Sequence, residues 1–244
     1  MEEERRERNF QKIFEHLPET AVMKKVISFS LGGNDPKYLI GALKNTDLAK
    51  EFYKDWECYF YCNKDVSPDF IESLAEKPNT KVHVEDGESD WTFSTKRFFP
   101  MSEDNVERVI FRDTDSRIGN REVAAVREWE KANLDAHIMR DHPHHGGFPI
   151  LAGMFGIKGG VIRNIKKLLE LNKNVKMQYH YDQIFLAKFI YPFIEDSVLV
   201  HDEFFDNKPF PTKREGLNFV GQVFNEHDET VPEHLNSLKD SLGK

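Results

Sequence analysis

The most constraining feature of this sequence is a run of β-forming residues, 106–111, followed almost at once by two aspartates, Asp113 and Asp115. Residues i and i+2 of an extended chain project to the same face, so both carboxylates can reach one cation at the strand exit. Mg²⁺ and Mn²⁺ prefer oxygen ligands and readily keep substrate phosphates as further ligands. The pattern predicts a divalent-metal site. The alternative is a solvated strand end, with Asp115 capping the next turn.

Strands and helices alternate along the rest of the chain. We expect further strands at residues 25–31, 57–62, 80–84 and 197–200, and helices from Pro36 and Ser67 onward and at residues 120–133, 161–171 and 181–193. Asp35 followed by Pro36 is a typical helix start. Strands separated by helices favour an α/β fold with a mostly parallel central sheet flanked by helices. Residues 140–160 are expected to be loop-rich.

The length of 244 residues fits one large domain. We place that domain at residues 23–224. A charged helical extension, residues 1–22, precedes it, and a polar tail, residues 225–244, follows it.

Charge and hydropathy exclude several classes of protein. The net charge of −8 argues against a general binder of nucleic acid or of anionic membranes. No apolar run reaches the length of a transmembrane span, and the charged N-terminus does not resemble a signal peptide. Cys58 and Cys62 would lie about 13 Å apart along one strand, too far to form a disulfide. A cytoplasmic protein with reduced thiols is expected.

The first strand ends at a glycine-containing loop, residues 32–34, that is neither a P-loop nor a complete dinucleotide-binding motif. A dehydrogenase of the Rossmann type is therefore disfavoured. Open α/β sheets bind ligands at the carboxyl ends of their strands. Ser30 and the loop amides would then contact a nucleotide, although an ordinary strand-to-helix turn explains the loop equally well.

Basic residues near the aspartates could hold phosphate oxygens. Arg97 precedes the fourth strand, and its forked guanidinium matches a phosphate better than the ammonium of Lys96 does. Arg117 follows the aspartate pair, but it could instead form a surface ion pair with Glu122. His201 ends the last expected strand and could add an imidazole to the metal site, whereas a surface histidine is the simpler interpretation.

An Asp-x-Asp at a strand end can hold the diphosphate of a nucleotide-sugar through a metal ion, and two segments between these motifs could contact the sugar of such a ligand. Gly153 lies among small and bulky apolar residues, a pattern typical of close backbone approach. Asp182 opens an apolar helix, where it either stabilises the helix N-terminus or faces the sugar. In the polar loop at residues 140–147 we favour Arg140 and Asp141 as pocket-lining residues. The spacing there does not match a standard zinc site, and we assign no role to His144 or His145.

The order of these motifs resembles the donor half of GT-A fold glycosyltransferases, in the style of family 8. The family's Asn-Ala-Gly-Val type segment is matched by Leu151-Ala152-Gly153-Met154, its Asp-Gln by Asp182-Gln183 and its late metal-binding histidine by His201. Leu151 departs from the usual asparagine. Residues 96–100, 112–117 and 137–143 resemble uncharacterised glycosyltransferase-like proteins of bacteria and large DNA viruses, and the whole resemblance covers residues 24–205.

The resemblance implies a metal-dependent glycosyltransferase with a GT-A-like single domain, located in the cytoplasm, or in the host cytoplasm if the protein is viral. It would transfer a sugar from a UDP- or GDP-linked donor to an acceptor hydroxyl, such as one on a glycan or on a protein-linked glycan. Mn²⁺ or Mg²⁺ would be held by Asp113, Asp115 and His201, and Asp182 and Asp141 would be catalytic. The donor would be bound by Ser30, Arg97, Arg117, Arg140, Gly153 and Gln183.

Two other functions fit part of the sequence. Phosphatases of the haloacid dehalogenase type also place an Asp-x-Asp at a strand end, but usually on the first strand, and no convincing Gly-Asp-x-x-x-Asp follows here. A phosphatase would hydrolyse p-nitrophenyl phosphate. The second alternative is a protein that binds nucleotide-sugars without catalysis, which would show no slow hydrolysis of the donor.

Overall fold

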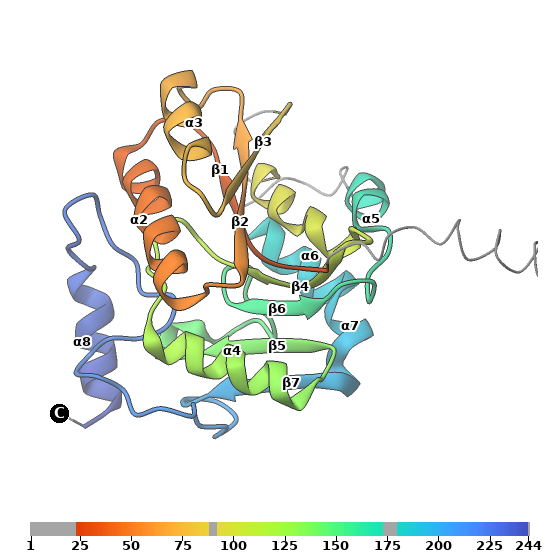
Figure 1. Ribbon diagram of the computed structural model, residues 1–244. Coiled ribbons are helices and arrows are strands. Elements are labelled where there is room, and N and C mark those ends of the chain that lie inside the picture. The colour runs from red at the N-terminus through yellow and green to blue at the C-terminus, as the bar shows by residue number, and fades with distance from the viewer. Residues whose placement is uncertain (1–22, 88–91, 173–179, 244) are drawn as a thin grey trace, which may run out of the picture.

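The computed structural model describes residues 23–87, 92–172 and 180–243 (Figure 1). Within these residues the chain forms one α/β domain, a seven-stranded sheet flanked by helices. The predicted fold class, with a mostly parallel central sheet, is confirmed. The charged helix expected in residues 1–22 lies outside the described residues.

The sheet has the strand order β3-β2-β1-β4-β6-β5-β7. Only β6 is antiparallel to its neighbours, β4 and β5, while the other pairs are parallel. The C-terminal ends of all strands but β6 therefore meet at one edge. The strands are β1 (Lys24–Leu31), β2 (Trp56–Asn63), β3 (Thr80–Glu85), β4 (Val106–Phe111), β5 (Ala136–Arg140), β6 (Phe155–Lys158) and β7 (Val198–Asp202).

Two strands of the sheet, β5 and β6, were not expected. Both are short; β5 ends where the segment expected to be loop-rich begins, and β6 lies inside that segment. Residues 136–140 and 155–158 carry little alternation of their own, because both faces of these strands are buried. Pairing with β4 and β7 makes them strands, and pairing is a tertiary property.

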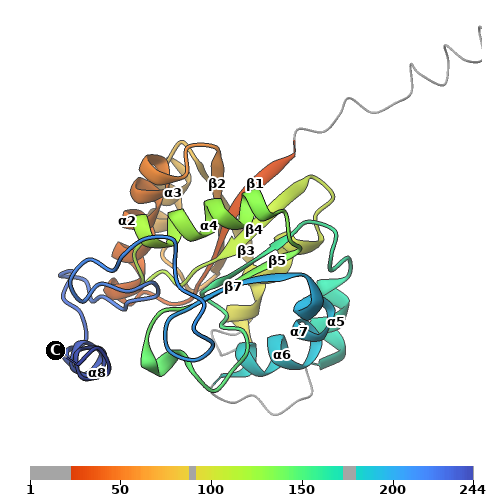
Figure 2. The same cartoon turned by 90° about the horizontal axis from the view of Figure 1, so that it is seen from below.

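Helices cover both faces of the sheet and make two hydrophobic cores (Figure 2). Val26 of β1 faces one core, and its neighbour Ile27 faces the other, as the alternation of a strand requires. The first core is covered by η1 (Phe93–Ser102), a 3₁₀ helix, and by α5 (Ile165–Asn172), α6 (Tyr181–Phe189) and α7 (Tyr191–Ile194). The second is covered by α2 (Pro36–Phe52), α3 (Pro68–Ala75) and α4 (Asn120–Ala132).

Two helices differ from the sequence prediction. The helix expected at residues 181–193 is divided at Ile190 into α6 and α7, and Pro192 explains the break because proline lacks the N–H that would continue the helix. The helix expected at residues 161–171 begins at Ile165. None of the helices in the described ranges is long and apolar enough to cross a membrane.

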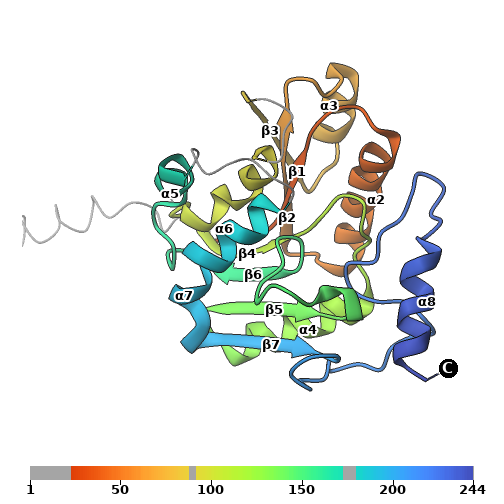
Figure 3. The same cartoon turned by 180° about the vertical axis from the view of Figure 1, so that it is seen from behind.

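The C-terminal segment packs on the domain and carries a helix, α8 (Pro232–Ser241) (Figure 3). Leu238 of α8 is fully buried, and the backbone carbonyl of His234 lies 2.8 Å from Nε2 of His142. His142 precedes η2 (Pro143–His145), a short 3₁₀ turn after β5. Farther upstream, the backbone N–H of Phe224 donates to the carbonyl of Asp115 at 2.8 Å. The segment expected to be a polar tail, residues 225–244, follows directly after this contact and carries α8.

The two cysteines are free and buried in β2. Burial raises the pKa of each thiol, Cys58 and Cys62, to about 12. The prediction that they do not form a disulfide with each other is confirmed.

Candidate functional site

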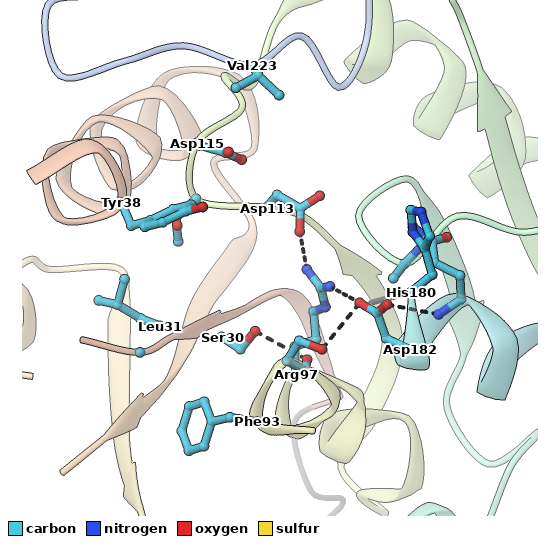
Figure 4. Close-up of a pocket in the computed structure, with 15 residues that line it drawn as sticks. Ser30, Leu31, Tyr38, Phe93, Arg97, Asp113, Asp115, His180, Asp182 and Val223 are labelled. Atoms are coloured by element: carbon cyan, nitrogen blue, oxygen red, sulfur yellow. Dashed lines mark hydrogen bonds and ion pairs between the residues drawn. The ribbon is translucent and has the colours of Figure 1, made fainter. Parts of the chain in front are cut away.

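A pocket of about 740 Å³ lies at the C-terminal ends of β1 and β4 (Figure 4). Ser30 and Leu31 line it from the end of β1, and the Asp113–Asp115 turn lines it from the end of β4. The first turn of α2, the helix η1, the start of α6 and Val223 of the C-terminal segment complete the wall.

The aspartate pair lies in this pocket, as the sequence predicts. Asp113 is about half exposed, with 51% of its side-chain surface accessible, whereas only 13% of Asp115 is accessible. Nζ of Lys37, in the first turn of α2, lies 2.9 Å from Oδ2 of Asp115. Burial raises the pKa of Asp115, and the negative charge of Asp113 raises it further. The site therefore holds two like charges, one of them poorly hydrated, that a cation would stabilise.

Gly41 of α2 brings Lys37 close to the aspartate turn. A Cβ on Gly41 would overlap the carbonyl oxygen of Thr114 and lie 3.0 Å from its carbonyl carbon. Only glycine allows the helix to approach the turn this closely.

Arg97 joins Asp113 to Asp182 across the pocket (Figure 4). Its Nη1 donates to Oδ1 of Asp113, and its Nη2 donates to Oδ2 of Asp182 at 2.8 Å. The residue is only 4% exposed. Arg97 was predicted to bind donor phosphates, and the structure places it in the pocket with its fork already paired to two carboxylates.

Asp182 both contacts the backbone of its own helix and lines the pocket. It lies in the first turn of α6, and its Oδ1 accepts the backbone N–H of Gln183 at 2.9 Å. Its other oxygen, Oδ2, accepts from Arg97 and from the hydroxyl of Ser94 at 3.3 Å, and the side chain lines the pocket. The carboxylate supports the helix start and also faces the cavity.

Three further predicted residues, Gly153, Gln183 and Ser30, lie in the pocket wall or next to it. A Cβ on Gly153 would overlap Oδ2 of Asp113 and lie 2.7 Å from its Cγ. Oε1 of Gln183 accepts the backbone N–H of Ala152 at 3.3 Å, which ties α6 to the same turn. Ser30 lines the pocket, and its hydroxyl donates to the carbonyl of Ser94 at 3.2 Å.

His201 is not brought to the aspartate pair. It lies on β7, and two strands, β6 and β5, separate β7 from β4, a step of about 14 Å across the sheet. Its ring is buried, with Nδ1 2.8 Å from Nε2 of His137 and Nε2 3.4 Å from Glu128 of α4. Among the described residues, no group of three or more His, Cys, Asp or Glu side chains is arranged to hold a metal ion.

Asp141 and Arg140 also lie outside the pocket lining. Asp141 is fully buried and accepts hydrogen bonds from Arg121 at 2.9 Å, Arg214 at 2.6 Å and the backbone N–H of Val220 at 2.9 Å. Burial raises the pKa of Asp141, and the two arginines oppose that shift. Arg140 pairs with Asp202 at 2.8 Å. The contacts of Asp141 with Arg214 and Val220 hold the C-terminal segment against the end of β5, and the Arg140–Asp202 pair joins β5 to β7.

Arg117 points away from the aspartate pocket. It pairs with Asp228 at 3.1 Å rather than with Glu122, and it lines a separate cavity of about 790 Å³ between α2, α4 and the C-terminal segment. Glu122 instead forms a buried ion pair with Arg112 at 2.9 Å.

The histidines of the loop after β5 pack against α8. Nδ1 of His142 accepts the backbone N–H of His144, and Nδ1 of His145 accepts the backbone N–H of Asp141, both at 3.0 Å. The ring of His234 on α8 lies 5.6 Å from that of His142. These contacts attach the loop after β5 to α8.

Sequence reasoning missed Lys37 and Tyr38 as residues of the site. Tyr38 lines the pocket, and Lys37 is bound to Asp115. The signal was present, because the helix start at Asp35-Pro36 directly follows the loop at the end of β1, so its first turn must lie at the binding edge of the sheet.

Neither a protein-family model nor a curated protein matches the chain. Solved structures do match it in architecture. The galactosyltransferase LgtC, in complex with donor and acceptor sugar analogs, is 16% identical, with 73% of each chain covered and a TM-score of 0.48. The glycosyltransferase GlyE of Streptococcus pneumoniae is also 16% identical with a TM-score of 0.48, over 74% of this chain and 46% of that one.

A third match is the 4-diphosphocytidyl-2C-methyl-D-erythritol synthase of Anaerococcus prevotii. It is 13% identical, with 91% of this chain and 99% of that chain covered and a TM-score of 0.47. All three TM-scores are below 0.5.

Proposed function

We propose that the protein is a metal-dependent glycosyltransferase that moves a sugar from a nucleoside-diphosphate sugar to an acceptor hydroxyl. One observation carries the proposal. A strand-end carboxylate pair, Asp113 and Asp115, shares a pocket with a third carboxylate, Asp182, at the edge where open α/β sheets bind ligands. The resemblance of the motif order to GT-A fold glycosyltransferases agrees with this arrangement.

The residues present fit a hard divalent cation. Mg²⁺ is commonly bound by one or two carboxylates together with substrate phosphates and water, so Asp113 and Asp115 suffice without a histidine. Burial and the negative charge of Asp113 raise the pKa of Asp115, although Lys37 opposes the shift, so a bound cation would further stabilise the ionised pair. When bound, Mn²⁺ or Mg²⁺ would neutralise the charge that develops on the diphosphate leaving group.

The chain's own residues then have separate roles. Ser30, Leu31 and Tyr38 line the β1 and α2 side of the pocket, where the nucleotide would lie. Gln183 lines the other side, next to Asp182, and Gly153 lies against Asp113. Asp182 would face the transferred sugar and stabilise positive charge that develops there, from a helix start that holds its carboxylate in place.

A thermal-shift screen of UDP- and GDP-linked sugars, with and without Mn²⁺, tests the proposal. A ligand that binds the native state raises the melting temperature by mass action. We expect a shift that requires Mn²⁺ and is abolished by EDTA, by Asp113→Ala and by Asp115→Ala. Asp104→Ala serves as the matched control, because Asp104 is an exposed carboxylate in the loop that precedes β4, at the opposite end of the strand.

Donor hydrolysis separates the proposal from its rivals. A transferase should hydrolyse its nucleotide-sugar slowly in the absence of acceptor and should leave p-nitrophenyl phosphate intact. Turnover of p-nitrophenyl phosphate would instead identify a phosphatase. Binding without any hydrolysis would identify a nucleotide-sugar-binding protein.

A further inference from the structure

We propose that Arg97 is a positioning residue that links the metal-binding carboxylate Asp113 to the sugar-facing carboxylate Asp182, rather than a ligand of the donor phosphates. The inference rests on the proposed function, because it assigns Arg97 a task within that site. It differs from the role that the sequence pattern predicts for Arg97.

The hydrogen bonds of the guanidinium support this role. An arginine has five N–H donors, and a bidentate grip on phosphate uses two neighbouring ones. Nη1 of Arg97 donates to Asp113 and to the carbonyl of Arg112 at 3.4 Å, and Nη2 donates to Asp182. Nε is buried and has no acceptor. The edge of the guanidinium directed at the pocket is therefore engaged by two carboxylates (Figure 4).

The backbone of Arg97 is also hydrogen-bonded to the central sheet. Its carbonyl accepts the hydroxyl proton of Ser28, at 2.7 Å, from the centre of β1. The residue lies within η1, which packs against β1 and β4. A buried guanidinium fixed to the central sheet is suited to set the positions of other groups.

Lys37 offers a useful contrast. Its side chain is 26% exposed and ends on Asp115 through a single ammonium group. The single ammonium of Lys37 can turn from Asp115 to a phosphate oxygen, whereas the buried guanidinium of Arg97 would lose one of its two carboxylate partners by leaving Asp113.

The arrangement couples two parts of the site that come from different elements. Asp113 follows β4 and Asp182 begins α6, and their only shared partner in the described residues is Arg97. A cation between them offsets their mutual repulsion and orients one oxygen of each. Removing the fork should loosen Asp113 as a metal ligand and Asp182 as a sugar-facing group at the same time.

Arg97→Lys tests the inference because lysine keeps the charge but cannot bridge two carboxylates. We would titrate UDP and GDP calorimetrically in Mn²⁺ and in EDTA, and define the metal increment as the ratio of the two affinities. Positioning predicts that the increment falls about tenfold while affinity in EDTA is unchanged. Direct phosphate binding predicts an equal loss of affinity in both buffers, and that result would overturn the inference.

Arg108→Lys is the matched control. Arg108 is also buried and pairs with Glu107 at 3.3 Å and with Asn133 at 3.0 Å, but it lies at the start of β4, away from the pocket. The control should keep the full metal increment. An unchanged increment in Arg97→Lys would also overturn the inference. If the wild-type protein binds neither nucleotide in Mn²⁺, the proposed function fails and the inference fails with it.

A second pair of variants keeps the test valid if Arg97→Lys does not fold. Asp182→Ala removes one anchor of Arg97, whereas Asp182→Asn retains an oxygen that can accept from Nη2. Positioning predicts that the metal increment falls several-fold in Asp182→Ala and recovers in Asp182→Asn, although Asp182 is not a proposed metal ligand. Equal increments in the two variants would contradict the coupling.

Discussion

The carboxylate of Asp113 lies directly against the α-carbon of Gly153, so closely that a Cβ at that position would overlap Oδ2. The contact explains why a glycine is needed there, although its backbone φ is not in the left-handed region. The turn between β5 and β6 thus sets the position of a proposed metal ligand.

Gly153→Ala should impair metal binding more than stability. The methyl group would push aside the end of a side chain that is half exposed, which costs less than displacing backbone. We expect the Mn²⁺-dependent affinity for UDP or GDP to fall about tenfold, with an unfolding free energy lowered by about 1 kcal/mol or less. Calorimetry and urea denaturation measure the two effects. Gly119→Ala, where a Cβ would meet open space, is the control; equal effects in both variants would refute the explanation.

Asp182→Asn should retain binding and lose turnover. The amide keeps an acceptor for Arg97 and for the backbone N–H of Gln183, so the helix start and the affinity for the nucleotide should be preserved. The missing negative charge should lower kcat for transfer and donor hydrolysis about a hundredfold. Steady-state kinetics with a calorimetric Kd checks this. Asp69→Asn is the control: it alters an aspartate in the first turn of another helix, α3, and should change neither kcat nor the Kd for the nucleotide. Loss of stability with unchanged kcat would show that Asp182 is only a cap.

Asp141→Asn should destabilise the protein without affecting catalysis by the folded molecules. Asp141 is fully buried and bound to Arg121 and Arg214, so removing its charge leaves two guanidinium groups with less compensation. We expect a loss of about 3–5 kcal/mol in urea unfolding. Activity per folded molecule should stay at the wild-type level, because Asp141 does not line the pocket. Asp206→Asn, at an exposed carboxylate, is the control. A kcat defect at full stability would restore the catalytic role predicted from the sequence.

Acid should weaken the attachment of the loop after β5. Burial lowers the pKa of His145 to about 3, with the nearby charges of His142, His234, His144 and Arg214 adding to the effect. The folded state holds the ring neutral, because its Nδ1 accepts the backbone N–H of Asp141. The unfolded state binds a proton near pH 6.5. The contribution of this ring to stability is therefore complete above pH 6.5 and is lost progressively as the pH falls toward 3.

His145→Asn removes the titration and keeps an acceptor for that N–H. Its melting temperature should fall less steeply than that of the wild type between pH 7 and pH 4.5, measured by circular dichroism. His227→Asn, at a side chain that is 72% exposed, should follow the wild-type curve. Parallel curves for His145→Asn and the wild type would rule out His145 as the source of the acid sensitivity.

Much of the fold could be predicted from local pattern. The strands β1, β2, β3, β4 and β7 are runs of β-forming residues bounded by turn signals, and α2 starts at the expected Asp35-Pro36. The strands β5 and β6 were not predicted, because their strand conformation depends on pairing with neighbours inside the sheet. Pro192 is a local signal for the break between α6 and α7, but the apolar pattern on both sides of it predicts one continuous helix.

The sequence by itself determined which side chains end β1 and β4, and hence that Ser30, Asp113 and Asp115 lie at one edge of the sheet. Parallel strands share that edge whatever their order. Only the tertiary structure decided that His201 stays away from the aspartates, because strand order places β6 and β5 between them. Likewise, only the tertiary structure buried Asp141 and placed Arg97 between two carboxylates. Ion pairs between residues far apart in the sequence depend on how helices and strands pack, and no local sequence pattern records that packing.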